Sequence, residues 1–303
     1  MEYLKPCEMR PYKMLLKINH KYCNSPMTIK TALTKSTEKF KNAKIPSARL
    51  DSELLLAHVV SESREYLIAH DDKELSPKQI KIFEDCMARR LDREPVCYIT
   101  NNLEFYGLDF FVDNRVLSPR VETELIAEQA IANAAQYSRL IDIGTGSGAL
   151  AIAIAKHRPD LTITATEVSP LAMQVAKLNA KNLLGKANKI NFVEADVWKG
   201  VEGKFETIVT NLPYVSEDYK PNMKPEVQKE PSIALFGGSG DGLDLYRRFY
   251  SDISEHLVPG SIVYHESDPW QHQGLKDLAA QAGLEPILEK YLILGFTKKI
   301  TIN

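Results

Sequence analysis

The chain has 303 residues, 44% of them hydrophobic and 26% charged, which suits a protein of two globular domains with ordinary cores. Its 38 basic and 40 acidic side chains give a formal net charge of -2, which argues against a protein that coats nucleic acid. No apolar run approaches the roughly 20 residues that cross a bilayer, and the four cysteines lack zinc-ligand spacing. We therefore expect reduced thiols, no metal site and a cytoplasmic protein without membrane association.

Residues 1–26 carry scattered basic side chains but lack the apolar region of a signal peptide. Thr28 is placed to cap a helix that starts directly after it, so Met27 is a candidate natural start. We expect residues 1–26 to form a poorly ordered extension.

Residues 27–94 have apolar side chains at helix spacing, most clearly over 50–59, and a further helix start at Ser76-Pro77. The pattern predicts a small helical bundle. Such a domain suits either a spacer or a unit that holds a macromolecular partner.

Residues 95–118 differ from the helical part in their residue types. Short aromatic and β-branched runs at 98–100, 104–107 and 110–112 are separated by Asn and Asp clusters that suit turns. This composition predicts a β-hairpin that links the helical bundle to the rest of the chain.

Residues 119–303 alternate between strand and helix patterns. The expected strands cover 140–143, 161–166, 190–193, 207–210 and 261–264, and helices are expected over 149–157 and from Ser169-Pro170 onward. This rhythm predicts an α/β domain with a doubly wound, mostly parallel sheet.

The first of these strands leads through Asp142 into a turn with Gly144, Gly146 and Gly148, and a helix follows. Glycines in such a turn let a ligand approach the backbone and meet free N–H groups at the helix start. Glu167 ends the next strand, where a carboxylate can accept both hydroxyls of a ribose. Strand, turn, helix and acid in this order predict a nucleotide-type cofactor site.

The glycine spacing distinguishes two classes of cofactor. Gly144, Gly146 and Ala149 satisfy the loose G-x-G-x-x-A pattern of nicotinamide enzymes. However, Gly148 follows Gly146 by two residues, and Asp142 precedes the first glycine by two. Both features resemble the first motif of the class I methyltransferases, which use S-adenosylmethionine.

That resemblance implies a cofactor site with three parts. Asp142 would help place the methionine part, Glu167 would hold the ribose, and Asp196 would lie beside the adenine. The full set of cofactor residues that it implies is Asp142, Gly144, Thr145, Gly146, Gly148, Glu167, Asp196, Val197, Trp198 and Asn211.

The chemistry of the site depends on Asn211-Leu212-Pro213-Tyr214, which ends the fourth expected strand at the edge where ligands bind. Asn211 Oδ1 and a main-chain carbonyl, that of Leu212 or Pro213, can accept both N–H bonds of a flat amide or amino group. They would aim its nitrogen at the methyl group, and Tyr214 can stack on it. The same carbonyls would stabilise positive charge on the methylated nitrogen, so no dedicated base is required.

The chain resembles the glutamine N5-methyltransferases of peptide chain release factors, the HemK/PrmC family, from Met27 to about Phe296. The segments that carry the resemblance are Glu104–Gly107, Val116–Glu124, Asp142–Gly148, Asn211–Tyr214, Glu230–Leu235 and Gly237–Tyr246. It implies a seven-stranded sheet and a glutamine substrate in the Gly-Gly-Gln tripeptide of class 1 release factors. It also implies that S-adenosylhomocysteine is the product and that the helical domain helps hold the partner.

The resemblance implies a site at which the amide of the substrate meets the cofactor. Its substrate-binding residues would be Phe105, Arg120, Thr123, Asn211, Leu212, Pro213 and Tyr214, with Asn211, Pro213 and Tyr214 as the catalytic ones. We expect a monomer that makes no direct contact with nucleic acid.

Leu212 departs from the family, which usually has Pro there, and Asn-Leu-Pro-Tyr also resembles the ribosomal RNA adenine dimethyltransferases. An adenine N6-methyltransferase acting on RNA or DNA is therefore the alternative, and a noncatalytic binding protein is a third reading. The block at 119–124 and the lack of a basic excess favour glutamine. Glu167 replaces the more usual Asp and keeps the charge. Glu266, after the fifth expected strand, is a candidate catalytic acid or base, but a supporting or structural role is favoured because no base is needed.

Overall fold

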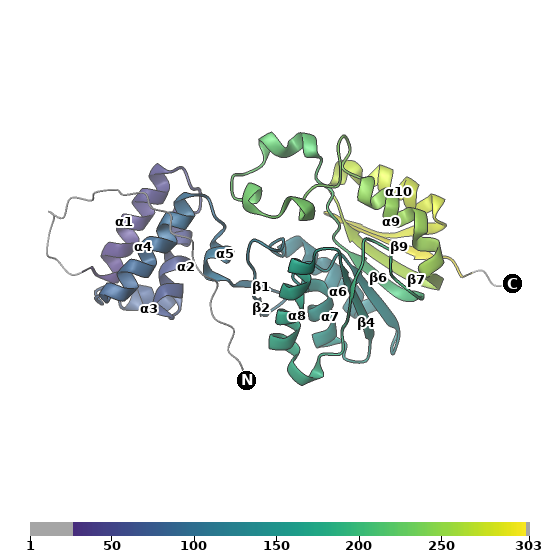
Figure 1. Cartoon of the computed structure of the whole chain (residues 1–303), viewed down its shortest axis with the longest axis horizontal. Coiled ribbons are helices and arrows are strands. Elements are labelled where there is room, and N and C mark those ends of the chain that lie inside the picture. The colour runs from purple at the N-terminus through teal and green to yellow at the C-terminus, as the bar shows by residue number, and fades with distance from the viewer. Residues whose placement is uncertain (1–26, 301–303) are drawn as a thin grey trace.

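The computed structural model describes residues 27–300, so the predicted extension at 1–26 lies outside the described residues (Figure 1). The N-terminal part is a helical bundle of α1 (Ile29–Asn42), α2 (Ala48–Val60), α3 (Arg64–Ala69) and α4 (Pro77–Leu91). The hydroxyl of Thr28 caps α1, and Ser76 forms a capping box with Gln79 at the start of α4. The bundle has a core of its own, which includes Phe40 and Phe83.

Residues 95–118 contain one element that the sequence did not predict. The run at 98–100, expected to be extended, lies in the short helix α5 (Val96–Thr100), which ends at Asn101 in a left-handed conformation. Tyr98 is buried there, and its hydroxyl donates to the carbonyl of Val116. This tertiary contact outweighs the strand preference of the local residues. The hairpin itself is shorter than expected and consists of β1 (Leu103–Phe105) and β2 (Leu108–Phe110).

The C-terminal part is built on a seven-stranded sheet in the order β5-β4-β3-β6-β7-β9-β8. The strands are β3 (Arg139–Ile143), β4 (Thr162–Glu167), β5 (Asn191–Glu194), β6 (Phe205–Thr210), β7 (Leu257–Glu266), β8 (Leu284–Lys290) and β9 (Ile293–Lys298). The first five run parallel to one another, whereas β9 runs antiparallel to both β7 and β8. The predicted doubly wound, mostly parallel fold is confirmed.

Helices cover both faces of this sheet (Figure 1). They are α6 (Glu124–Asn133), α7 (Ala149–His157) and α8 (Pro170–Leu184) on one face, and α9 (Asp244–Asp252) and α10 (His272–Gln281) on the other. Side chains of β3 alternate between the two cores, with Leu140 on the α7 side and Ile141 on the α9 side. Among residues 27–300, no helix is both long and apolar enough to cross a membrane.

The remaining helical turns are of the 3-10 type. They are η1 (Val121–Thr123), η2 (Gly185–Ala187), η3 (Glu217–Asn222), η4 (Val227–Lys229), η5 (Ser232–Ala234), η6 (Ile253–His256) and η7 (Pro269–Gln271). Three of them, η3 to η5, lie in residues 215–236, which we call the cover segment. Its ends meet in a bridge between Val215 and Phe236, so it forms a closed loop on the surface.

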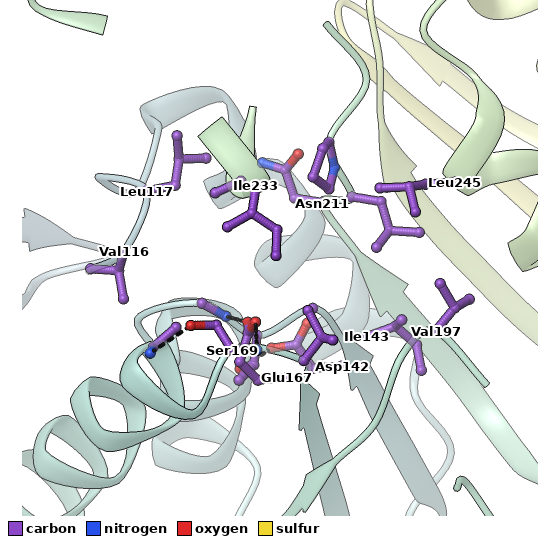
Figure 2. A pocket seen from close by; sticks show the side chains of 18 of the residues that line it. Val116, Leu117, Asp142, Ile143, Glu167, Ser169, Val197, Asn211, Ile233 and Leu245 are labelled. Atoms are coloured by element: carbon purple, nitrogen blue, oxygen red, sulfur yellow. Dashed lines mark hydrogen bonds between the residues drawn. The ribbon is translucent and has the colours of Figure 1, made fainter. Parts of the chain in front are cut away.

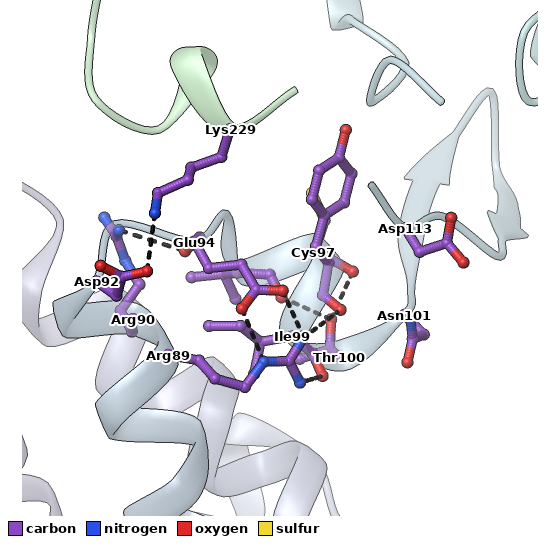
Figure 3. Close-up of polar contacts among 12 residues, drawn as sticks. Arg89, Arg90, Asp92, Glu94, Cys97, Ile99, Thr100, Asn101, Asp113 and Lys229 are labelled. Atoms are coloured by element: carbon purple, nitrogen blue, oxygen red, sulfur yellow. Dashed lines mark hydrogen bonds and ion pairs between the residues drawn. The ribbon is translucent and has the colours of Figure 1, made fainter. Parts of the chain in front are cut away.

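The cover segment makes ion pairs with the helical bundle. Arg90 of α4 is buried and binds both Asp51, at 2.7 Å, and Glu226 of the cover segment, at 2.9 Å. Arg93 also reaches Glu226, and Figure 3 shows Lys229 extending from the cover segment to Asp92. These contacts join two parts of the chain that are more than a hundred residues apart in sequence.

Candidate active site

The sheet order places a binding site where β3 and β6 lie side by side. The chain leaves β3 for β4 on one side and later returns to β6 on the other, which makes a topological switch point. A cavity of about 500 Å³ lies at the carboxyl ends of these strands (Figure 2). Asp142 and Glu167 lie on one side of it, and Asn211 and Ile233 lie on the opposite side.

The glycine turn between β3 and α7 forms part of the cavity wall. Gly148 has φ of +85°, and a Cβ atom there would lie 2.7 Å from Ile152 Cδ1 and 3.4 Å from Ala176 Cα. Only glycine allows this close approach of α7 to α8. The turn therefore presents its backbone, without side-chain cover, to a ligand in the cavity.

Asp142 is buried beneath this turn with an incomplete set of hydrogen bonds. Its Oδ2 accepts from Thr145 Oγ1 at 2.6 Å and from the backbone N–H of Ala151 at 3.3 Å. Its Oδ1 is buried and has no partner within residues 27–300. Burial, with a smaller contribution from nearby Glu167, raises the pKa of Asp142 to about 7. A buried acceptor without a donor at a cavity wall fits a cationic or N–H group of a ligand.

Glu167 ends β4 and is 8% exposed. Its Oε2 accepts from the N–H of Gly146, and its Oε1 accepts from that of Ser169, both at 2.9 Å. Burial raises the pKa of this carboxyl, and the two backbone hydrogen bonds oppose the rise. Because each oxygen keeps a second lone pair, the carboxylate can still accept the two hydroxyls of a ribose.

Of the residues predicted to lie beside the adenine of the cofactor, some line the cavity and one does not. Asp196 and Val197 line it, and Asp196 pairs with Arg248 at 2.7 Å. Trp198 points elsewhere: its indole stacks on His256 and donates to the carbonyl of Phe249 in the core under α9. We therefore leave Trp198 out of the proposed cofactor site.

Asn211 lies just beyond the end of β6 and lines the cavity. Its Nδ2 donates to Thr123 Oγ1 at 3.0 Å, and Thr123 in turn donates to Glu266 Oε2 at 2.5 Å. Tyr214 donates to the other oxygen of Glu266 at 2.9 Å. Burial raises the pKa of Tyr214, and the neighbouring Glu266 raises it further, so the phenol stays protonated. Within residues 27–300, Asn211 Oδ1 receives no hydrogen bond.

The backbone that follows Asn211 is held by close contacts with two glycines. A Cβ atom on Gly237 would lie 2.4 Å from the carbonyl oxygen of Pro213, and one on Gly242 would lie 2.3 Å from that of Tyr214. Gln271 Nε2 donates to the Tyr214 carbonyl at 2.8 Å. These contacts fix the main-chain carbonyls of the motif, and the sequence signal for them was the glycine spacing at 237–242.

Leu212, which replaces the usual Pro of the family, faces the protein interior. It is 5% exposed, belongs to the core under α9, and its Cδ2 would lie 3.3 Å from a Cβ atom on Gly144. The side chain thus packs against the glycine turn, and the motif keeps its carbonyl groups. The substitution changes packing at the cavity floor and adds no polar group to the site.

Two further predicted substrate residues lie in different surroundings. Arg120 lines the cavity and binds Glu230 at 2.6 Å and Ser118 at 2.5 Å, so its guanidinium is held in place. Phe105 is 1% exposed and packs edge-on against Phe110 in the core beneath the hairpin, outside the cavity lining. Its position supports the hairpin, and we leave it out of the proposed substrate contacts.

The arrangement brings together a glycine turn, two buried carboxylates and an acceptor side chain, all at the carboxyl edge of a seven-stranded sheet. This fold and site define a class I methyltransferase. A methyltransferase from Pyrococcus furiosus has a similar fold, with a TM-score of 0.50 over 72% of this chain and 100% of that one at 19% identity.

Comparison with known proteins narrows the class. The PrmC N-terminal domain model matches residues 31–100, and the methyltransferase small domain model matches residues 121–228. The chain is 36% identical to the release factor glutamine methyltransferase of Koribacter versatilis, over 83% of this chain and 91% of that protein. It is also 36% identical to that of Clostridium acetobutylicum, over 79% and 86%. The chain belongs to the release factor glutamine methyltransferase family.

Proposed function

We propose that this enzyme transfers a methyl group from S-adenosylmethionine to the side-chain amide nitrogen of the glutamine in the Gly-Gly-Gln motif of class 1 release factors. S-adenosylhomocysteine is the second product. The observation that carries the proposal is Asn211: its Nδ2 is engaged by Thr123, and its Oδ1 at the cavity wall has no hydrogen-bond partner among the described residues. A free acceptor at this place suits an N–H donor such as a glutamine amide.

The residues of the cavity fit the proposed cofactor. Asp142 Oδ1, which has no partner within residues 27–300, suits the ammonium group of the methionine part, and Glu167 suits the two ribose hydroxyls. Asp196 and Val197 would lie beside the adenine. The cofactor supplies an electrophilic methyl group, so the protein mainly has to place the acceptor nitrogen.

Placement rests on two acceptors. Asn211 Oδ1 and the carbonyl of Leu212 or Pro213 would receive the two N–H bonds of the glutamine amide and hold its nitrogen in line with the methyl group. The same oxygens stabilise the positive charge that forms on this nitrogen. The methylated nitrogen then loses a proton readily, and the residues in the cavity need not include a base.

The partner requires a second surface. We assign residues 27–94 as the domain that holds the release factor, residues 95–118 as the linker, and residues 119–303 as the methyltransferase domain. We further propose that the enzyme acts as a monomer in the cytoplasm, where release factors act, and that nucleic acid takes no direct part. The near-balance of 38 basic and 40 acidic residues supports the last point.

The test is transfer of labelled methyl groups to a purified class 1 release factor. Its controls are a release factor with the Gly-Gly-Gln glutamine replaced by alanine, an Asn211→Ala enzyme, and an enzyme with the exposed Asn182 replaced by alanine. We expect labelled methyl groups on the intact release factor only, and only when the enzyme is the wild type or Asn182→Ala. Label on RNA or DNA instead would overturn the proposal in favour of adenine methylation.

A further inference from the structure

We propose that Glu266 is a positioning residue that decides which end of the Asn211 carboxamide faces the substrate, and that it acts through the hydroxyl of Thr123. The inference deepens the proposed function, on which it rests for its substrate. It assigns a specific role to an acid for which sequence patterns support only a general supporting or structural expectation. Glu266 does not line the cavity, so it does not act on the reacting atoms directly.

The sheet register explains why these groups meet. Strands β6 and β7 are parallel neighbours, and Thr210 pairs with His265. Asn211 directly follows the end of β6 and Glu266 is the last residue of β7, so both lie at the carboxyl edge. Thr123 reaches the same place from the last residue of η1 and is 4% exposed. Three segments distant in sequence thus form one hydrogen-bonded chain.

The direction of the hydrogen bonds follows from the number of protons. A threonine hydroxyl has a single proton, and an ionised carboxylate can only accept. Thr123 therefore donates to Glu266, at 2.5 Å, and is left as an acceptor for Asn211, at 3.0 Å. Only the NH2 end of the Asn211 amide can occupy that position. The oxygen end is thereby turned toward the cavity.

The orientation matters because the two ends of the amide have opposite hydrogen-bonding properties. With Oδ1 toward the cavity, Asn211 meets the NH2 group of a glutamine as an acceptor. With the amide reversed, an NH2 group would face an NH2 group, and neither could bond. The Glu266 carboxylate thus determines, from behind the site, whether Asn211 can receive the substrate.

Glu266 is itself held rigidly by hydroxyl groups. It is 2% exposed, its second oxygen accepts from Tyr214 at 2.9 Å, and its main-chain carbonyl accepts from Tyr246 at 2.6 Å. Within residues 27–300 no basic side chain pairs with it. The acid that raises its pKa further, after burial, is Glu122. Two hydroxyl donors to the carboxylate and a third to the main-chain carbonyl, in place of a cation, give Glu266 a fixed geometry, which suits an orienting role.

The kinetic test uses the full chain with Glu266→Gln, Thr123→Val and the two changes combined. Gln places an NH2 group on one side, so Thr123 is free to donate toward Asn211 and the amide can reverse. We expect kcat on the release factor to fall about tenfold to a hundredfold in each single variant. The double variant should lose no more than the worse single one, because both changes break the same chain.

Further measurements separate positioning from a purely structural role. The dissociation constant of S-adenosylhomocysteine and the melting temperature should change little compared with kcat, and Thr123→Ser should recover most of the activity that Thr123→Val loses. Unchanged kcat in Glu266→Gln, or additive losses in the double variant, would overturn the inference. A third outcome would also overturn it. If Glu266→Gln lost far more activity than Thr123→Val and its pH profile lost the acid limb, Glu266 would be identified as a catalytic base.

A measurement without substrate keeps this inference distinct from the proposed function. Neutron diffraction of the wild type and of Glu266→Gln locates the hydrogens of the Asn211 amide directly. We expect Nδ2 to face Thr123 in the wild type and a reversed or mixed amide in the variant. The same orientation in both would overturn the role of Glu266, whatever the enzyme methylates. If the amide orientation depended on Glu266 but the enzyme did not methylate release factors, only the proposed function would be overturned.

Discussion

Asp142→Asn is expected to abolish a pH dependence of cofactor binding that the wild-type enzyme shows below neutral pH. The wild-type pKa of about 7 arises because the carboxyl is buried, with a smaller contribution from the nearby Glu167 carboxyl. The ionised form binds an ammonium group at Oδ1 far more strongly than the neutral form, because the carboxylate adds charge attraction to the hydrogen bond. Binding below this pKa must therefore also remove a proton from Asp142.

The size of the effect follows from that value. About one carboxyl in ten is ionised at about pH 6, and most are ionised at about pH 7.5. The dissociation constant of S-adenosylhomocysteine should thus be roughly eightfold larger at the lower pH, which corresponds to about 1.2 kcal/mol. In Asp142→Asn the affinity should be weaker at neutral pH and almost flat across this range. Titration calorimetry at a series of pH values measures both curves.

The stability of the ligand-free protein provides a second, independent test of the raised pKa of Asp142. A carboxyl whose pKa is raised on folding adds stability that is fully present below its unfolded pKa and is lost as the pH rises through about 7. The melting temperature of the wild type relative to Asp142→Asn should therefore fall between about pH 4 and pH 7. Parallel affinity curves for the two proteins, with no relative change in melting temperature, would refute the reasoning.

Three other predictions concern the frame of the site. Gly237→Ala forces a methyl group against the Pro213 carbonyl, so it should lower kcat and should lower the free energy of unfolding by about 1–3 kcal/mol. Gly274→Ala, whose Cβ would have an ordinary 3.4 Å contact, should change neither quantity. Leu212→Ala should cost about 2–5 kcal/mol in a denaturation experiment while glutamine remains the methylated group, and label on adenine would contradict this. Glu226→Gln weakens the ion pairs to Arg90 and should raise KM for the release factor while cofactor affinity stays constant, which an equal change in both would contradict.

The elements that the sequence predicted best are those with local signals. Helix α7 covers the expected residues 149–157, and the hydroxyls of Ser76 and Ser169 cap their helices as expected. The residues at 98–100 were assigned to the wrong element because burial of Tyr98 against Val116 is a long-range contact that local preference does not contain.

The site residues also fall into those that local patterns predict and those whose position depends on tertiary structure. The glycine turn and Glu167 follow from the order of strand, turn and helix, and the structure places them around one cavity. Trp198 is adjacent to lining residue Val197 yet faces the core, because sequence neighbours point in different directions. Glu266 was recognised as an acid after a strand, but its contact with Thr123 depends on strand order and register, which no local pattern encodes.

The cover segment contacts both the cofactor cavity and the helical bundle that we propose holds the release factor. Ile233, Ala234 and Phe236 of this segment line the cavity, while Glu226 of the same loop is bound to Arg90 of the helical bundle. A partner that shifted the bundle would therefore be expected to displace residues of the cavity wall. By thermodynamic reciprocity, any change in cofactor affinity caused by the docked protein equals the change in docking affinity caused by the cofactor. Because the exposed Lys229–Asp92 ion pair is part of this connection, added salt should weaken that part of the coupling, whereas the pair between buried Arg90 and Glu226 should persist.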